Sequence, residues 1–105
     1  MKELEKDEII KYLSNVKERY KGNGLEKLAL FGSFAKSSDG VYSDIDVAIK
    51  KEPNFLSKYS PYEYFELVNS IKEDIKKQLN RNVDIFDLDS KSTFLKDIKK
   101  ELIYV

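Results

Sequence analysis

Apolar residues recur along this chain with two different spacings, and each spacing predicts a different kind of element. Residues 3–21 carry apolar side chains at helical spacing, and the glycine-rich residues 22–24 end this first predicted helix. Residues 25–31 and 42–50 are short, mostly apolar runs next to turn-forming residues, which indicates two strands. Between them, residues 33–36 are expected to begin a short helix.

The middle of the chain predicts a loop followed by a long helix. Residues 52–60 are expected to form the loop, with Phe55 and Leu56 tucked against the domain in preference to lying exposed to a partner. The stretch Ser60-Pro61-Tyr62-Glu63 has the composition of a helix start, because serine caps, proline suits the first helical position and glutamate completes a capping box. The helix is expected to reach about residue 79, with a stripe formed by Phe65, Val68, Ile71, Ile75 and Leu79.

The last third predicts one more strand and one more helix. Residues 83–86 form a third strand, which Asp84 interrupts. Ser90 or Ser92 can cap a final helix whose apolar residues are Phe94, Leu95, Ile98 and Leu102. Residues 103–105 form a short terminal strand or dock their apolar side chains. The predicted fold class is α/β.

The amino-acid composition excludes several kinds of functional site. The 105 residues suit one domain spanning 1–105, and 19 basic residues balance 19 acidic ones, which argues against a broad nucleic-acid surface. Without cysteine or histidine there are no disulfides, no thiolate nucleophiles, no zinc sites of the usual type and no histidine-based triads. No apolar run reaches membrane-spanning length and the N-terminus does not resemble a signal peptide, so we expect a cytoplasmic protein.

Two carboxylates occupy the start of the second strand, in the sequence Asp44-Ile45-Asp46. If this segment is extended, Asp44 and Asp46 point to one side, and their Cα atoms lie roughly 6–7 Å apart. That separation lets both carboxylates reach one hard cation, while Ile45 and the following apolar residues face a core. Two exposed strand carboxylates are the structural alternative, but like charges so close repel without a cation.

A Gly-Ser corner precedes this pair by ten residues. Gly32 lets the backbone approach a ligand closely, Ser33 adds a hydroxyl group, and a turn from strand to helix presents free N–H groups to phosphate. A phosphate cradle beside a two-carboxylate metal site is the equipment of metal-assisted phosphoryl or nucleotidyl transfer.

Gly32-Ser33, ten intervening residues and Asp44-x-Asp46 together resemble the G-S-x10-D-x-D signature of the DNA polymerase beta-like nucleotidyltransferase superfamily, and the length is most similar to its minimal nucleotidyltransferase (MNT) branch. The resemblance implies the nucleotidyltransferase fold, a small mixed sheet with helices packed on one face. It also implies that Asp44 and Asp46 bind Mg²⁺, that Gly32 and Ser33 hold phosphates, and that ATP is the nucleotide donor.

A third carboxylate on a neighbouring strand completes the metal site in this family, and Asp84 is the matching position. Asp87 and Asp89 follow closely, and alternation alone leaves the opposite parity open. An exposed edge-strand position is the structural alternative for Asp84. Many family members carry Arg-Gly where Lys36-Ser37 stand here, so Lys36 either contacts phosphate or is a solvated surface lysine.

The resemblance also suggests the acceptor. MNT proteins of this size typically accompany a helical HEPN partner in a toxin–antitoxin module, in which the MNT protein attaches AMP to a tyrosine of the HEPN ribonuclease. Two alternatives remain: a non-catalytic antitoxin that masks its partner by contact, and a subunit of an enzyme that modifies a small molecule such as an aminoglycoside.

Overall fold

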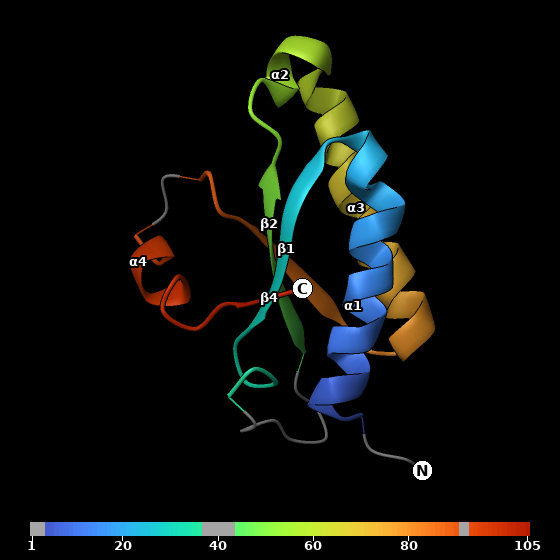
Figure 1. Ribbon diagram of the computed structural model, residues 1–105, viewed down its shortest axis with the longest axis vertical. Coiled ribbons are helices and arrows are strands. Elements are labelled where there is room, and N and C mark those ends of the chain that lie inside the picture. The colour runs from blue at the N-terminus through green and yellow to red at the C-terminus, as the bar shows by residue number, and fades with distance from the viewer. Residues whose placement is uncertain (1–3, 37–43, 91–92) are drawn as a thin grey trace.

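A computed structural model of the chain describes residues 4–36, 44–90 and 93–105 (Figure 1). Four strands, four α-helices and one short 3₁₀ helix are found in these ranges. In chain order they are α1 (Lys6–Tyr20), the 3₁₀ helix η1 (Lys21–Asn23), β1 (Leu25–Phe31), β2 (Ile45–Lys51), α2 (Phe55–Lys58), α3 (Pro61–Leu79), β3 (Val83–Asp87), α4 (Leu95–Ile98) and β4 (Ile103–Tyr104).

The described strands form one mixed sheet in the order β3-β2-β1-β4. Strand β1 pairs antiparallel with both β2 and β4, whereas β2 and β3 are parallel. The parallel pair is connected through α3, because two parallel strands require a crossover that returns the chain to the same end of the sheet. The mixed sheet confirms the predicted fold class, and the three long strands lie where the sequence pattern placed them.

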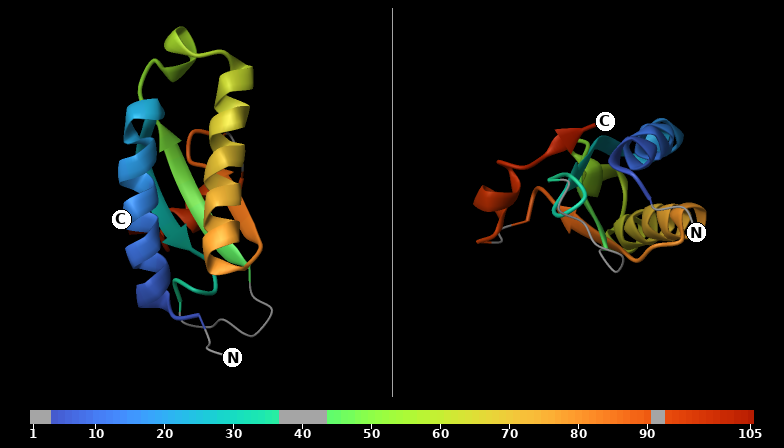
Figure 2. Two further views of the ribbon diagram at one scale, coloured as in Figure 1. Left: turned by 90° about the vertical axis from the view of Figure 1, so that its right-hand side faces the viewer. Right: turned by 90° about the horizontal axis from the view of Figure 1, so that it is seen from below.

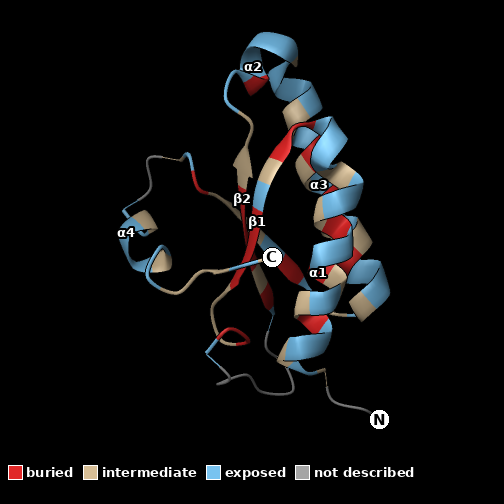
Figure 3. Cartoon of the chain, in the orientation of Figure 1, coloured by how far each residue is buried: buried red, intermediate tan, exposed pale blue. Residues whose placement is uncertain are grey.

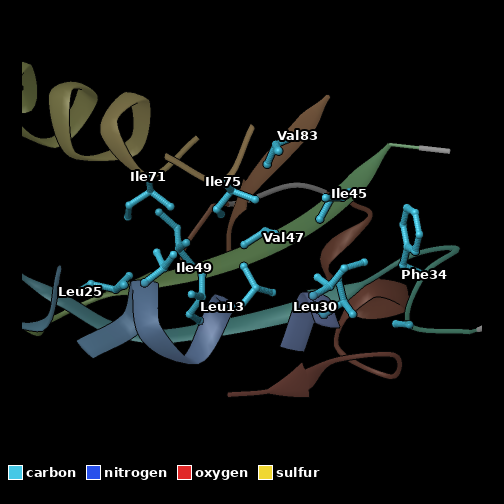
Figure 4. Close-up of a cluster of buried hydrophobic side chains, with 14 of the residues drawn as sticks. Leu13, Leu25, Leu30, Phe34, Ile45, Val47, Ile49, Ile71, Ile75 and Val83 are labelled. Carbon is cyan, nitrogen blue, oxygen red and sulfur yellow. The ribbon is translucent and has the colours of Figure 1, made fainter. Parts of the chain in front are cut away.

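Helices α1 and α3 lie side by side over one face of the sheet, while α4 lies on the opposite side (Figure 2). The buried residues in Figure 3 are concentrated on the sheet and on the helix faces turned towards it. The main core lies between these layers, where Leu13 of α1, Ile71 and Ile75 of α3, and Val47 and Ile49 of β2 are fully buried (Figure 4).

Helix α3 begins as predicted, but one residue of its predicted apolar stripe lies outside the core. The hydroxyl of Ser60 accepts a hydrogen bond from the Glu63 backbone N–H, and the Glu63 carboxylate accepts one from Ser60 N–H, both at 3.1 Å. Phe65 is 65 % exposed, whereas Leu67 is buried with Ile71. Six residues separate Phe65 from Ile71, which turns Phe65 about 120° away from the buried face.

The loop predicted before α3 contains the short helix α2, and the two apolar residues there have different environments. Phe55 is buried beneath Gly24 and stacks against Tyr59 with 4.6 Å between ring centroids. Leu56 is 58 % exposed, so the prediction that both residues are tucked in is wrong for Leu56. Consecutive helical residues differ by about 100° in direction, so a one-turn helix cannot bury both.

The second face of the sheet carries small residues that allow another segment to approach. Ala29 and Ala48 are fully buried and pack with Leu88, and the partly buried residues Leu95, Ile98 and Leu102 cover them. The predicted last helix is therefore present, but it is shorter than expected. It begins after Phe94, which is 68 % exposed, and its cap position is not the predicted serine; Ser92 lies outside the described residues.

No described helix combines the length and the apolar character that crossing a membrane requires.

Candidate active site

The large apolar side chains of β2 and the Asp46 carboxylate lie on opposite faces of the sheet. Ile45, Val47 and Ile49 are fully buried against the helices, so Asp46 lies on the other face of the sheet, half-exposed. Asp44 lies just before the strand and is exposed. The beginning of the strand expected at residue 42 falls outside the described residues.

Asp84 lies next to Asp46 in the sheet. The two residues are direct partners in the parallel register of β2 and β3, and such partners point to the same face. Asp84 is exposed. Asp87 points to the helix-covered face instead, where it accepts hydrogen bonds from Tyr64 of α3 and from Lys51, the latter at 2.7 Å. Of the aspartates that the sequence left open on this strand, the structure therefore brings Asp84 to the carboxylate pair.

Gly32 brings the other half of the sequence motif against Asp46. Phe31 and Asp46 are paired in the β1–β2 register, and Gly32 follows directly with a φ of +79°. A Cβ atom on Gly32 would lie 2.1 Å from Oδ2 of Asp46, far inside van der Waals contact. Glycine is therefore required here both for the backbone conformation and for the close approach of the carboxylate.

Residues 33–36, which are expected to begin a short helix, form a turn, and the segment into which that helix would continue lies outside the described residues. The Lys36 N–H donates to the Gly32 carbonyl at 3.1 Å, and Ser33 lies half-buried within this turn. Phe34 is 1 % exposed and packs into the end of the core beside Ile45 and Leu30 (Figure 4). The buried phenyl ring therefore anchors the Gly-Ser corner in the core.

Lys36 is paired in a way that the sequence did not indicate. Its Nζ lies 2.6 Å from Oε1 of Glu101, a residue of the segment between α4 and β4. The Lys36 side chain is 54 % exposed, so the pair lies at the surface. No sequence pattern links these two positions. Lys36 lies in the turn after β1, whereas Glu101 lies between α4 and β4 near the end of the chain.

The carboxylate cluster shifts the proton equilibrium of its central member. Burial, and then the neighbouring charges of Asp84 and Asp44, raise the pKa of Asp46 above its ordinary value of 3.8. Each of these effects disfavours the ionised form, so an ionised Asp46 is electrostatically unfavourable where it stands. A cation bound beside it would relieve this cost.

Comparison with known proteins identifies the family. Residues 7–105 match the family described as Polymerase beta, Nucleotidyltransferase. The chain belongs to this nucleotidyltransferase family. It is also 32 % identical over 102 residues to a protein of Methanocaldococcus jannaschii that carries the provisional name of a protein adenylyltransferase, covering 95 % of this chain and 93 % of that one. The resemblance seen in the Gly-Ser and Asp-x-Asp motif is thus confirmed, and this nucleotidyltransferase is an enzyme.

Solved structures share the fold of this nucleotidyltransferase. A structure described as a minimal nucleotidyltransferase superposes with a TM-score of 0.70 at 18 % identity, covering 98 % of both chains. A structure described as a tri-AMPylated Shewanella oneidensis HEPN toxin in complex with MNT antitoxin matches with a TM-score of 0.60 at 21 % identity, covering 94 % of this chain and 70 % of the other. At these identities the likeness establishes the fold alone.

The residues of the nucleotidyltransferase site suit Mg²⁺ in chemistry. Asp44, Asp46 and Asp84 offer only carboxylate oxygens, which are the ligands that Mg²⁺ prefers, and Gly32 leaves room for the Asp46 carboxylate beside the backbone. Within residues 4–36, 44–90 and 93–105, no three acidic side chains already stand in a metal-holding arrangement. A metal ion would have to draw the exposed carboxylates of Asp44 and Asp84 towards Asp46. The ligand roles of all three remain predictions.

Two residues near this site were not found by sequence reasoning. Glu101 pairs with Lys36, and the Arg81 guanidinium lies 5.7 Å from the centroid of the Phe34 ring, at the base of the Gly-Ser turn. Arg81 precedes β3 just as Asp44 precedes β2, so its proximity follows from the parallel pairing of these strands. Neither residue lies within a motif, and only the sheet topology brings them to the turn.

Proposed function

We propose that this nucleotidyltransferase moves AMP from ATP to a hydroxyl group, with Asp44, Asp46 and Asp84 holding Mg²⁺. The observation that carries the proposal is the direct contact between Gly32 and the Asp46 carboxylate, because it joins the phosphate-binding corner to the acidic cluster. The pairing of Asp46 with Asp84 adds a third carboxylate on the same face. A triphosphate bound at Gly32 and Ser33 would therefore meet the acidic cluster.

The proposed reaction requires that the phosphates are oriented, that their charge is offset and that the proton of the acceptor hydroxyl is removed. Ser33 and the backbone after Gly32 bind the β- and γ-phosphates and so orient the α-phosphorus. Bound Mg²⁺ would supply positive charge that offsets the charge developing on the phosphates. Asp84 accepts the proton of the acceptor hydroxyl as its oxygen bonds to the α-phosphorus, and the bond from that phosphorus to the bridging oxygen breaks to release pyrophosphate.

The proposed acceptor is a tyrosine of a helical HEPN-type partner. Two comparisons support a protein acceptor: the M. jannaschii relative is named for protein adenylylation, and the S. oneidensis neighbour is in complex with an AMPylated HEPN toxin. An antitoxin role follows if adenylylation neutralises the partner.

Transfer of label from ATP tests this proposal. The protein is purified with whatever accompanies it in its host and incubated with Mg²⁺ and ATP labelled at either the α- or the γ-phosphate. We expect α-label on a partner protein, no γ-label, and no transfer by the Asp44→Asn/Asp46→Asn variant. Transfer that survives in this variant would contradict the assigned site, and absence of transfer to a partner that stays bound and inhibited would favour a contact-only antitoxin.

A further inference from the structure

Lys36 and Glu101 connect the nucleotide-binding turn to the C-terminal part of the chain. Their charged atoms lie 2.6 Å apart, and both side chains keep contact with solvent, at 54 % and 30 % exposure. Lys36 belongs to the turn that Gly32 and Ser33 begin, and its N–H closes that turn on the Gly32 carbonyl. The ammonium group is thus held by a carboxylate at the edge of the proposed phosphate site.

Glu101 is fixed in this position by elements on both sides of it. Its backbone N–H donates to the Ile98 carbonyl at 3.0 Å, at the end of α4. Leu102 packs on the face that carries Ala29 and Ala48, and Ile103 pairs with Leu30 in the sheet. In Figure 1 this segment runs from α4 to β4, the edge strand beside β1.

The turn that carries Lys36 is also fixed. Phe34 and Ala35 are buried, at 1 % and 9 % exposure, so the backbone of the turn is anchored in the core. The pair therefore joins two anchored segments that are distant in the sequence.

A pair of this kind is easily exchanged. Ion pairs between solvent-exposed side chains contribute little, because water and salt screen them and two flexible side chains must be held. A triphosphate carries several negative charges, and its oxygens form stronger charge-assisted hydrogen bonds with an ammonium group. Lys36 can therefore leave Glu101 for a phosphate that arrives at Gly32 and Ser33.

We propose that Glu101 is a positioning residue that holds Lys36 when no nucleotide is bound and competes with the triphosphate for it. The inference rests on the proposed function, since it assumes that the turn binds ATP. Glu101 lowers the affinity for nucleotide because it occupies the Lys36 ammonium group, which the triphosphate must take from it. Lys36 returns to Glu101 when the phosphates leave.

Calorimetric binding of a non-hydrolysable ATP analogue with Mg²⁺ tests this competition. We expect the Glu101→Gln variant to bind the analogue about two- to fivefold more tightly than the wild type, a range set by the small strength of an exposed ion pair. Lys36→Met should weaken binding, and in the double variant the gain from Glu101→Gln should largely vanish, because Glu101 acts through Lys36. Glu18→Gln, which changes an exposed carboxylate of α1, is the matched control and should bind like the wild type.

A spectroscopic signature separates this role from a structural one. The ¹³C NMR resonance of Lys36 Cε should shift when Glu101 is replaced by glutamine, and in the wild type when the analogue is added. Unchanged or weaker binding by Glu101→Gln, or an equal gain in the Lys36→Met background, would overturn the inference alone. Failure of the wild type to bind the analogue at all would overturn the proposed function together with it.

Discussion

Gly32 allows the Asp46 carboxylate to lie against the backbone, and replacing this one hydrogen atom tests that contact. In Gly32→Ala the new methyl group would displace Asp46, because Oδ2 lies 2.1 Å from the position of the Cβ atom. We expect nucleotidyl transfer to fall by roughly 100-fold, the scale of a 1 Å misplacement of a reacting group. The unfolding free energy should fall by about 1–2 kcal/mol, since an L-residue is strained at positive φ.

Gly22→Ala is the control for this substitution. Apart from its own helix backbone and chain neighbours, no atom lies within 4 Å of a Cβ atom built on Gly22, and its backbone is not in the left-handed region. Nucleotidyl-transfer rates are measured for both variants. The rate of Gly22→Ala should be close to that of the wild type, whereas the rate of Gly32→Ala should be much lower. Wild-type activity in Gly32→Ala would show that the contact between Gly32 and Asp46 is not needed.

The raised pKa of Asp46 leads to an expectation of how the stability of the Mg²⁺-free protein depends on pH and on added Mg²⁺. Its pKa is raised in the folded state, so the stability that its protonated form contributes is present below the ordinary value of 3.8 and is lost as pH rises through the folded value. Asp46→Asn should therefore stabilise the Mg²⁺-free protein near neutral pH, by up to about 1 kcal/mol because solvent screens the half-exposed group. Transfer should be lost.

Thermal unfolding with and without Mg²⁺ measures this effect. Mg²⁺ should raise the wild-type midpoint by relieving the repulsion, and it should raise the midpoint of Asp46→Asn much less. Asp97→Asn, at an exposed position of α4, should respond to Mg²⁺ as the wild type does. An equal response in all three proteins would contradict a cation site at Asp46.

Asp87 links three elements at the end of the sheet that lies away from the candidate site. This residue of β3 accepts hydrogen bonds from Lys51 of β2 and Tyr64 of α3. Burial alone would raise the pKa of Asp87, but these hydrogen bonds outweigh it, and the pKa lies below the ordinary 3.8. The stability that Asp87 contributes is thus present above 3.8 and is lost as pH falls through the lower folded value.

Urea unfolding of Asp87→Asn tests this junction. We expect a loss of about 1–3 kcal/mol near neutral pH, because a half-buried ammonium group loses its charged partner. The loss should shrink as pH falls below 3.8. Asp89→Asn is the matched control, since Asp89 lies 3.4 Å from the same Lys51 Nζ but is exposed, and it should cost less than about 1 kcal/mol. Equal losses in the two variants would contradict the junction.

At the scale of elements, a long hydrophobic pattern predicted the position of an element correctly, whereas a short pattern or the end of one did not predict which side chains are buried. Helices α1 and α3 and strand β1 lie where the pattern predicts, because their periodicity extends over several turns or over a whole apolar run. Phe65 and Phe94 fit such patterns in the sequence but are exposed in the structure. A residue at the end of a pattern is assigned to a face by the tertiary packing and not by its spacing.

At the scale of the molecule, the sequence singled out residues that the structure brings close together, but it did not indicate what supports them. The spacing of Gly32 and Asp46 indicated a common site, and the pairing of β1 with β2 brings them into contact. Glu101 could not be foreseen, because its position depends on the packing of α4 against the second face of the sheet and on the pairing of β4 with β1. That packing depends on the small side chains of Ala29 and Ala48, which suit many other arrangements as well.

The most direct test of the central claim is the intact mass of the protein that co-purifies with this nucleotidyltransferase. Wild-type chain and the Asp44→Asn/Asp46→Asn variant are each expressed with the native partner, and the partner's mass is measured from both complexes. Our account predicts a partner that carries whole AMP groups with the wild type and none with the variant, although both complexes form. A partner with the same mass in both complexes would contradict transfer by this site.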